Sequence, residues 1–177
     1  MSVRYSKAGR YSVVVFVMAT LLAIVLPMPP VAGAPDDTEK DLRGFDSTMV
    51  RREKARRDML KGKSFLADGS LSMARKAFND ALTLDEDLHE ARFCLGLTEY
   101  RDNKFKLAIA QFKSLYERSP DYRNLRLELA RSYLATGDCS EAKRWLDLHL
   151  KKHKADKETD KLKRDIGKCT KRREKKS

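Results

Sequence analysis

The sequence predicts an all-α protein beyond residue 46, and three observations support this prediction. Proline is nearly absent from this part of the chain, where Pro120 is the only one. Apolar residues recur with the 3.6-residue period of amphipathic helices. Similar residues also return three times at one constant, longer spacing. The expected helices cover residues 48–67, 71–84, 88–101, 104–118, 121–135, 139–153 and 156–171.

Four sets of residues carry this longer spacing, and within each set the residue numbers rise by 34. Three of the sets are the small residues Gly62, Gly96 and Ala130, the alanines Ala74, Ala108 and Ala142, and the large apolar residues Phe78, Phe112 and Leu146. The fourth set stands between helical stretches and consists of Gly69, Asn103 and Gly137. A turn there needs residues that tolerate positive φ, as glycine and asparagine do. The spacing therefore predicts helical hairpins joined by tight turns.

This pattern closely resembles the tetratricopeptide repeat (TPR) family, whose unit is a helix–turn–helix of about 34 residues. The middle copy also has the family's Leu-Gly pair at Leu95–Gly96 and its terminal proline at Pro120. The resemblance covers about residues 55–156 and implies three helix pairs in a right-handed superhelix. It implies small residues where the two helices of a pair pack closely, and large apolar residues between pairs. We expect the helix 156–171 to cap the end.

Two departures from the family pattern introduce charge. Lys61 occupies the position that Leu95 and Leu129 hold in the other copies. Glu99 occupies the position of an aromatic residue, which is Tyr133 in the third copy and Phe65 in the first. Irregular outer copies are common in repeat arrays, so these departures bear on the edges of the repeat.

The segment 1–34 has the features of a secretory signal peptide. A basic start with Arg4, Lys7 and Arg10 precedes the apolar run 13–26, and small residues follow. The alternative is an uncleaved signal anchor, residues 13–34, that holds the protein on the outer face of a membrane. The apolar run is short for a span, which needs about 20 residues. We therefore expect cleavage after Gly33 or Ala34 and a periplasmic or secreted protein.

The rest of the chain divides into three parts by composition. Residues 35–46 are polar and predict a linker, with Asp46 or Ser47 capping the next helix. Residues 47–171 form the expected repeat domain with its capping helix, and residues 172–177 a basic tail. The net charge of the 177 residues is +12, and loss of the three basic residues of the signal peptide leaves +9. This excess favours anionic partners, although export argues against nucleic acid as one of them.

Two cysteines are placed to form a disulfide. Facing residues of an antiparallel hairpin have a constant sum of residue numbers, and three pairs share one sum: Leu146 with Leu162, Ala142 with Ile166, and Cys139 with Cys169. A Cys139–Cys169 bridge would close a loop worth about 3–4 kcal/mol in the chain-entropy model, and export permits it. The alternative is two reduced, half-buried thiols. Cys94 is expected to be an inert core thiol, with an intermolecular link as the alternative.

The sequence shows no catalytic or metal-binding motif. It has no Cys-x-x-Cys, no His-Glu-x-x-His and no glycine-rich phosphate loop. His149 and His153 lie one helical turn apart, but only carboxylates such as Asp147 or Asp156 could add a third metal ligand. Two partly solvated histidines are the simpler interpretation. We therefore expect no enzyme activity, no cofactor and no metal.

The family resemblance implies a concave groove lined by the first helix of each pair. Carried over by position, the groove residues are Met59, Lys63, Leu66, Phe93, Leu97, Tyr100, Arg101, Leu127, Arg131 and Leu134. An apolar floor that carries Lys63, Arg101 and Arg131 suits a partner segment with apolar anchors and acidic groups. Alternatively, several apolar members, Leu97 and Leu134 especially, belong to the core between pairs.

The groove lacks the Lys/Asn/Lys/Arg set with which some family members grip the C-terminal carboxylate of chaperones. The corresponding positions here include Met59, Lys63, Cys94, Asn124 and Glu128. We therefore do not expect chaperone binding.

Two basic clusters remain, one formed by Arg51, Arg52, Arg56 and Arg57 and the other by Lys171, Arg172 and Arg173. Each basic residue near anionic lipid is worth about 1 kcal/mol. Neither cluster has interleaved aromatic residues, so neither indicates a reader of single-stranded nucleic acid. The sequence thus predicts a non-enzymatic adaptor that binds a protein of a cell-envelope assembly. The alternative is peripheral binding to anionic membrane lipid or glycan.

Overall fold

A computed structural model of the protein describes residues 37–175, with side chains described for 47–175. The predicted signal peptide lies outside these residues. The chain divides into two units, Met1–Asp41 and Leu42–Ser177, and the second is described below. Residues 37–175 contain no strand. Their helices are α2 (Asp37–Ala67), α3 (Leu71–Leu84), α4 (His89–Arg101), α5 (Phe105–Arg118), α6 (Leu125–Ala135), α7 (Cys139–Leu150) and α8 (Lys157–Glu174).

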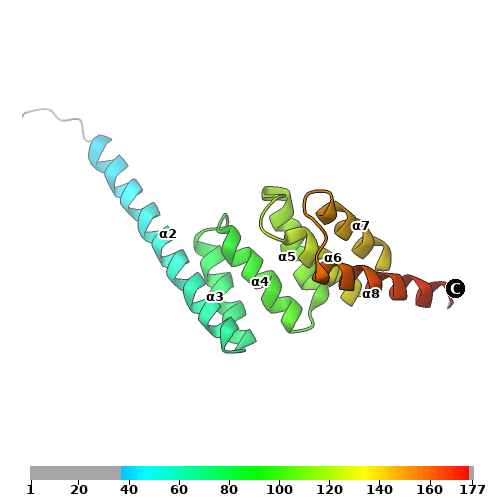
Figure 1. Ribbon diagram of the computed structural model, residues 1–177. Helices are drawn as coiled ribbons and strands as arrows, with labels where there is room; N and C mark the ends of the chain where they lie inside the picture. The colour runs from blue at the N-terminus through cyan, green and yellow to red at the C-terminus, as the bar shows by residue number, and fades with distance from the viewer. Residues whose placement is uncertain (1–36, 176–177) are drawn as a thin grey trace, which may run out of the picture. The chain divides into compact units, whose positions relative to one another are not determined.

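Successive helices pack against each other as antiparallel hairpins, as Figure 1 shows for α4 with α5 and α6 with α7. Further contacts join α3 to α4, α5 to α6, and α7 to α8. The last helix, α8, also contacts α6. This arrangement confirms the all-α prediction, and it places α8 against both helices of the preceding pair.

In two of the pairs, the close approach of a phenylalanine to the partner helix requires glycine. A Cβ atom added to Gly62 would lie 2.6 Å from the ring of Phe78, and one added to Gly96 would lie 2.4 Å from the ring of Phe112. In the third pair the same two positions hold Ala130 and Leu146, which are both buried. The phenylalanines therefore fill space within a pair, although the resemblance implies a role between pairs.

The turns have the conformation that the sequence predicts. Positive φ occurs at Gly69 (77°), Asn103 (58°) and Gly137 (81°), which is the predicted set. These residues lie between α2 and α3, α4 and α5, and α6 and α7. Arg123 also has positive φ (42°), in the segment before α6.

Two helices begin elsewhere than predicted. Helix α2 begins at Asp37, so most of the predicted linker is helical. Acidic residues near a helix N-terminus favour this start, and no proline interrupts the segment. Helix α6 begins at Leu125 rather than residue 121, because the positive φ of Arg123 is incompatible with a continuous helix.

The C-terminal helices also differ from the prediction at their ends. Helix α7 ends at Leu150 rather than at residue 153, and α8 extends to Glu174 rather than to residue 171. Residues 172–174 of the predicted basic tail are therefore helical. The start of α8 is fixed by a capping box, in which Asp156 accepts from the Thr159 backbone and Thr159 accepts from the Asp156 backbone.

A partly buried ion pair takes the place of an apolar contact between α3 and α4. Glu99 is 4 % exposed, and it accepts a hydrogen bond from Arg75 Nε at 2.8 Å. One repeat later the same two positions hold Ile109 and Tyr133, which pack against the hydrophobic core. The charge of the glutamate that departs from the family pattern is thus satisfied by an arginine of the preceding helix. Arg75 also pairs with Asp102.

We predict that Gly96→Ala destabilises the domain by roughly 1–3 kcal/mol, because the added methyl group overlaps the buried ring of Phe112. The measurement is urea-induced unfolding followed by circular dichroism. Adding Phe112→Leu should restore part of the loss, since it recreates the combination found at Ala130 and Leu146.

The matched control is Gly167→Ala, which also changes a glycine inside a helix. Nothing lies within 4 Å of its added Cβ, so helix propensity should stabilise this variant by up to about 1 kcal/mol. Equal effects of the two alanines would contradict the packing explanation.

Candidate functional site

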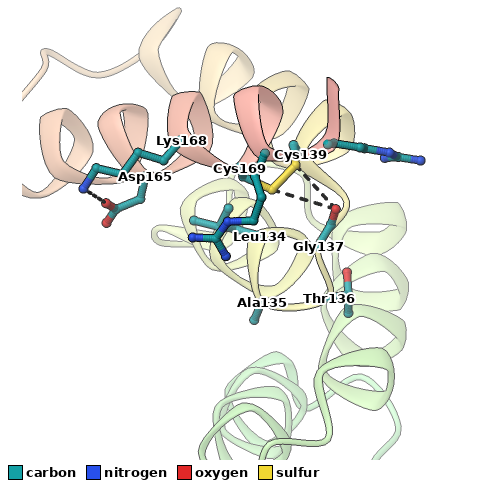
Figure 2. Close-up of a pocket in the computed structure, with 10 residues that line it drawn as sticks. Leu134, Ala135, Thr136, Gly137, Cys139, Asp165, Lys168 and Cys169 are labelled. Atoms are coloured by element: carbon teal, nitrogen blue, oxygen red, sulfur yellow. Dashed lines mark hydrogen bonds and ion pairs between the residues drawn. A yellow bond between two sulfur atoms is a disulfide. The ribbon is translucent and has the colours of Figure 1, made fainter. Parts of the chain in front are cut away.

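A disulfide joins the start of α7 to the last part of α8. The Cα atoms of Cys139 and Cys169 are 5.8 Å apart, within the range for a bridge. Figure 2 shows both sulfur atoms beside the carbonyl oxygen of Gly137, at 3.5 and 3.9 Å. These are contacts rather than hydrogen bonds, because a disulfide sulfur carries no hydrogen.

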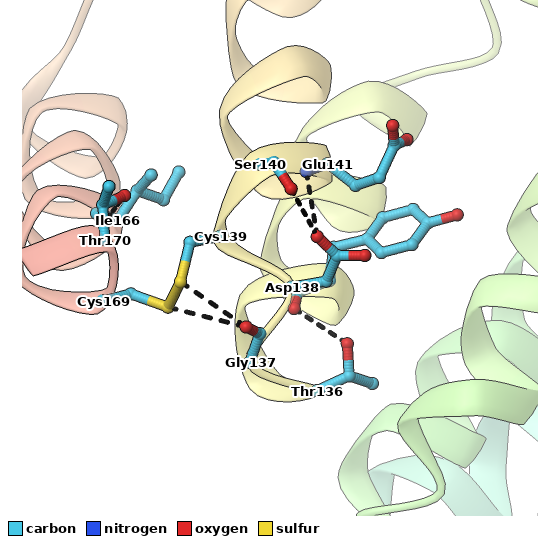
Figure 3. The surroundings of a disulfide bond; sticks show 10 residues. Thr136, Gly137, Asp138, Cys139, Ser140, Glu141, Ile166, Cys169 and Thr170 are labelled. Carbon is cyan, nitrogen blue, oxygen red and sulfur yellow. Dashed lines mark hydrogen bonds between the residues drawn. A yellow bond between two sulfur atoms is a disulfide. The ribbon is translucent and has the colours of Figure 1, made fainter. Parts of the chain in front are cut away.

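The register that predicted this bridge is present in the core. Leu146, Leu162, Ala142 and Ile166, which share the residue-number sum of the two cysteines, all lie in one buried cluster. Figure 3 shows Ile166 on α8 one turn before Cys169, with Cys139 opposite on α7. The structure therefore contains the predicted disulfide on the predicted helices.

Helix α8 occupies the position of the first helix of a further pair. Lys63 of α2 pairs with Glu90 of α4, with 2.9 Å between Nζ and Oε1. At the equivalent positions two repeats later, Arg131 of α6 pairs with Glu158 of α8. Equivalent ion pairs thus link α2 to α4 and α6 to α8. The helix expected only to cap the array also extends the side lined by the first helices of the pairs, which the family resemblance predicts to be concave.

The predicted groove positions continue into α8 at the spacing of the repeat. Three residues of α8 lie 34 positions after predicted groove residues of α6. They are Lys161 after Leu127, Asp165 after Arg131, and Lys168 after Leu134. The same sets contain Met59 and Phe93, Lys63 and Leu97, and Leu66 and Tyr100 in the earlier pairs. The sequence prediction missed the three residues of α8, because it treated α8 as a cap. The spacing itself was a signal that could have found them.

Two adjoining recesses lie between α6 and α8. The smaller, about 310 Å³, is lined by Tyr100, Arg131, Leu134, Ala135, Glu158, Lys161, Leu162 and Asp165. The larger, about 650 Å³, is lined by Leu134, Ala135, Thr136, Gly137, Cys139, Asp165, Lys168, Cys169, Arg172 and Arg173, as Figure 2 shows. They share Leu134, Ala135 and Asp165 and form one groove, named here the α6–α8 groove.

Three predicted groove residues are core residues instead, and one of them, Leu66, is buried in the core around α3. Leu127 is 3 % exposed and Phe93 is 7 % exposed. The Phe93 ring packs against Tyr122, with centroids 5.6 Å apart, and the Arg123 guanidinium lies over it at 5.8 Å. The segment between α5 and α6 therefore covers the floor of the groove at this point. A partner cannot use Phe93 or Leu127 directly.

The other apolar groove residues keep part of their surface accessible. Met59, Leu97, Tyr100 and Leu134 are partly buried against the two hydrophobic clusters. Of these, Tyr100 and Leu134 line the α6–α8 groove, so the alternative that Leu134 is only core does not describe it. The role of these side chains in binding stays a prediction.

The cations of the predicted groove already have acceptors within the chain. Lys63 pairs with Glu90, and Arg101 donates to the backbone oxygen of Leu66 at 3.1 Å. Arg131 pairs with both Glu128 and Glu158. The groove floor therefore offers less positive charge to a partner than the sequence suggests.

Glu90 is the acceptor that joins three pairs of helices. Besides Lys63, it accepts from Arg123 at 2.6 Å and from the Tyr122 hydroxyl at 3.2 Å. Burial opposes its ionisation, but the hydrogen bond from Lys63 and the charge of Arg123 together lower its pKa below the usual 4.5. Burial, together with the Glu90 charge, raises the pKa of Tyr122 to about 12. The carboxylate is thus ionised and the phenol protonated at neutral pH.

Two buried groups of the concave side are unsuited to contact a ligand. Glu128 is buried, and this burial raises its pKa, although Arg131 opposes the effect. Burial likewise raises the pKa of the Cys94 thiol. Cys94 is a free buried cysteine, as expected for an inert core thiol.

The histidine pair and the basic clusters lie outside the groove or at its end. The His149 and His153 rings stack at 4.5 Å, and burial lowers the pKa of His149. Within residues 47–175, no three potential metal ligands cluster together. The basic residues on α2, namely Arg51, Arg52, Arg56 and Arg57, are exposed, as are Lys171, Arg172 and Arg173 on α8. No helix of the described part is both long and apolar enough to span a membrane.

Comparison with known proteins identifies the class of fold. The tetratricopeptide repeat family model matches residues 99–166. Solved structures of the same fold include the first TPR domain of human RPAP3, with TM-score 0.66, 16 % identity and coverage of 71 % of this chain and 99 % of that one. The first TPR of Spaghetti (RPAP3) bound to an HSP90 peptide gives TM-score 0.64 and 17 % identity, over 67 % and 94 % of the two chains.

A bacterial structure is also similar. The Yersinia enterocolitica type III secretion chaperone SycD, in complex with a peptide of the translocator YopD, gives TM-score 0.55 and 18 % identity, over 69 % of this chain and 94 % of that one. No curated protein matches the sequence. The protein has an all-α TPR fold, and the match of the family model supports the TPR family.

We predict that Glu90→Gln lowers stability at neutral pH by about 1.5–3 kcal/mol, because it weakens hydrogen bonds to two charged groups. The folded-state pKa of Glu90 lies below its ordinary value of 4.5. Its contribution is therefore present above the unfolded pKa and is lost as the pH falls through the folded value. Urea unfolding at pH 7 and at pH 3 should show a smaller difference between the two proteins at pH 3.

The matched control is Glu117→Gln on α5, an exposed glutamate without an ion pair among residues 47–175. It should change stability little at either pH. A difference for Glu90→Gln that persists undiminished at pH 3 would show that the ionised carboxylate is not the cause.

Proposed function

We propose that the protein is a non-enzymatic interaction module that binds a segment of another protein in the α6–α8 groove. The observation that carries the proposal is the combination of apolar and cationic side chains around this recess, from Tyr100 and Leu134 to Lys161. Peptide complexes of two structurally similar proteins, with HSP90 and YopD peptides, support this use of the fold. At 17 % and 18 % sequence identity these structures support the fold only, so the nature of the partner is inferred from the residues of the groove.

Chaperone tails are not the proposed partner. Of the positions that correspond to the carboxylate-gripping set, Cys94 and Glu128 are buried. Lys63 is paired with Glu90. These positions therefore lack the free donors that a terminal carboxylate needs.

We further propose that the module acts outside the cytoplasm, in a cell-envelope assembly. The basic start and apolar run of residues 1–34 support export. The Cys139–Cys169 disulfide supports it independently, because such bonds persist in oxidising compartments. An anchor formed by residues 13–34 would give the same orientation without release.

Peripheral binding to anionic lipid or glycan is the second candidate function. The exposed Met49 and Val50 line a recess on α2 with Arg52 and Arg56, which is a combination of apolar and basic groups suited to a membrane surface. Sedimentation with phosphatidylglycerol vesicles that is lost in Arg52→Glu with Arg56→Glu would favour this function.

We predict that Tyr100→Ala with Leu134→Ala abolishes capture of a specific envelope protein, because both half-buried side chains border the groove. The measurement is photo-crosslinking in the native host from a benzoylphenylalanine at Lys161, followed by mass spectrometry. Leu107→Ala on α5 is the control, since this leucine is 51 % exposed and lies outside the groove. Capture that survives the double variant but fails in the control would refute the assignment.

If the protein is exported, its intact mass should show this. The measurement is mass spectrometry of protein purified from its own host and alkylated without reduction. The mass should lack the segment that ends at Gly33 or Ala34 and carry one alkylated thiol, that of Cys94, with two hydrogens missing for the disulfide. Buried Cys94 requires denaturant during alkylation. A full-length mass with three alkylated cysteines would contradict both the cleavage and the bridge.

A further inference from the structure

We propose that the α6–α8 groove selects an acidic peptide segment with an apolar side chain, and that binding requires the Cys139–Cys169 disulfide. This inference rests on the proposed function and specifies its partner and its condition. Three features carry it: the charges around the groove, its apolar floor, and the way in which the end of α8 is attached.

The groove has a surplus of positive charge that the described residues do not neutralise. Its cations are Arg131, Lys161, Lys168, Arg172 and Arg173, and its carboxylates are Glu158 and Asp165. The carboxylates are already paired, Glu158 with Arg131 and Asp165 with Lys168. Within residues 47–175, no ion pair involves the other three cations.

This charge distribution distinguishes the groove from the rest of the concave side. Near α2 and α4 the corresponding cations, Lys63 and Arg123, both bind Glu90. An acidic segment would have to displace that carboxylate there. In the α6–α8 groove it would meet three cations that need no displacement, which favours binding at this end.

The floor of the groove is apolar and recessed. Leu134 and Ala135 of α6 line both recesses, and Leu162 of α8 and Tyr100 of α4 line the smaller one. A side chain of a peptide can enter a recess of about 310 Å³ between two helices, whereas a flat lipid surface cannot. The partner that fits is therefore an acidic peptide with a leucine-like anchor rather than a membrane.

The disulfide holds the part of α8 that carries most of these cations. Ile166 is the last buried residue of the helix, and residues 167–174 have none. Cys169, bonded to Cys139, is therefore the last attachment of this segment to the rest of the domain. Lys168, Arg172 and Arg173 all follow Ile166. Without the bond, the end of α8 is free to fray, and the wall of the larger recess is lost.

The test uses the chain from residue 35 onward with the disulfide formed, because it is the proposed mature protein. The probe is a synthetic peptide, Glu-Glu-Leu-Asp-Asp-Leu-Glu-Glu, and its counterpart has lysine at every acidic position. Titration is followed by ¹H–¹⁵N NMR. The acidic peptide should shift the amide signals of Ala135, Thr136 and Gly137, and the lysine peptide should not.

Charge reversal tests the electrostatic part. Lys161→Glu with Arg172→Glu should weaken binding of the acidic peptide about tenfold or more. The matched control, Lys106→Glu with Lys113→Glu on exposed positions of α5, changes the net charge equally and should leave the dissociation constant within about twofold. Equal weakening of peptide binding by both variants would show that only the net charge matters, and would overturn the inference.

Reduction tests the disulfide part. Dithiothreitol breaks the S–S bond, supplies two electrons and two protons to give two thiols, and becomes its own cyclic disulfide. Binding should weaken about tenfold or more, while circular dichroism shows that the helices remain. Unchanged affinity in the reduced, folded protein would overturn the requirement for the bond. If the reduced protein unfolds, the affinity of the Cys169→Ser variant for the peptide is compared with that of the disulfide-bonded protein. Equal affinity of the two proteins would overturn the requirement for the bond.

The outcomes separate this inference from the proposed function. Shifts centred on Met59 or Leu97 would place peptide binding elsewhere on the concave side, which would overturn the inference and the choice of the α6–α8 groove but leave the interaction module intact. The inference would also be overturned if neither peptide binds. Binding of phosphatidylglycerol vesicles through Arg172, without peptide binding, would assign the cations to a membrane instead.

Discussion

The contact between a phenylalanine ring and the backbone of a glycine on the partner helix sets the geometry on which the rest of the domain depends. Phe112 lies where a methyl group on Gly96 would be, and Phe78 stands in the same relation to Gly62. This close approach fixes the distance and register within a pair. Because the spacing repeats, it also aligns the first helices of successive pairs, and these helices carry the concave side.

The alignment gives the inner and outer parts of the concave side different electrostatic roles. Glu90 gathers Lys63, Arg123 and Tyr122 and so joins three helix pairs. The charges around Glu90 therefore hold the helix pairs together. At the last helix the same kind of contact, Arg131 with Glu158, leaves other cations uncompensated because α8 has no following pair to neutralise them among the described residues. The basic helix α8 thus keeps cations that no described carboxylate neutralises.

The disulfide compensates for a weakness of this terminal helix. Leu162 and Ile166 bury α8 against α7, but the turns that follow contain no buried residue. A cross-link at Cys169 supplies the attachment that hydrophobic packing does not. It acts on a helix whose exposed face is strongly basic, and such a face cannot be buried without the cost of desolvating its charges.

The sequence by itself determined the number and order of the helices from residue 48 onward, the positive-φ turns within the pairs and the pairing of Cys139 with Cys169, because each depends on local conformation or on the spacing along one hairpin. It did not determine which groove residues are accessible. Phe93 is covered because Arg123 and Tyr122 fold over it from the next pair, and Lys63 is neutralised by Glu90 from the following helix pair. Only the tertiary structure decides such contacts, since they depend on the stacking of whole helix pairs.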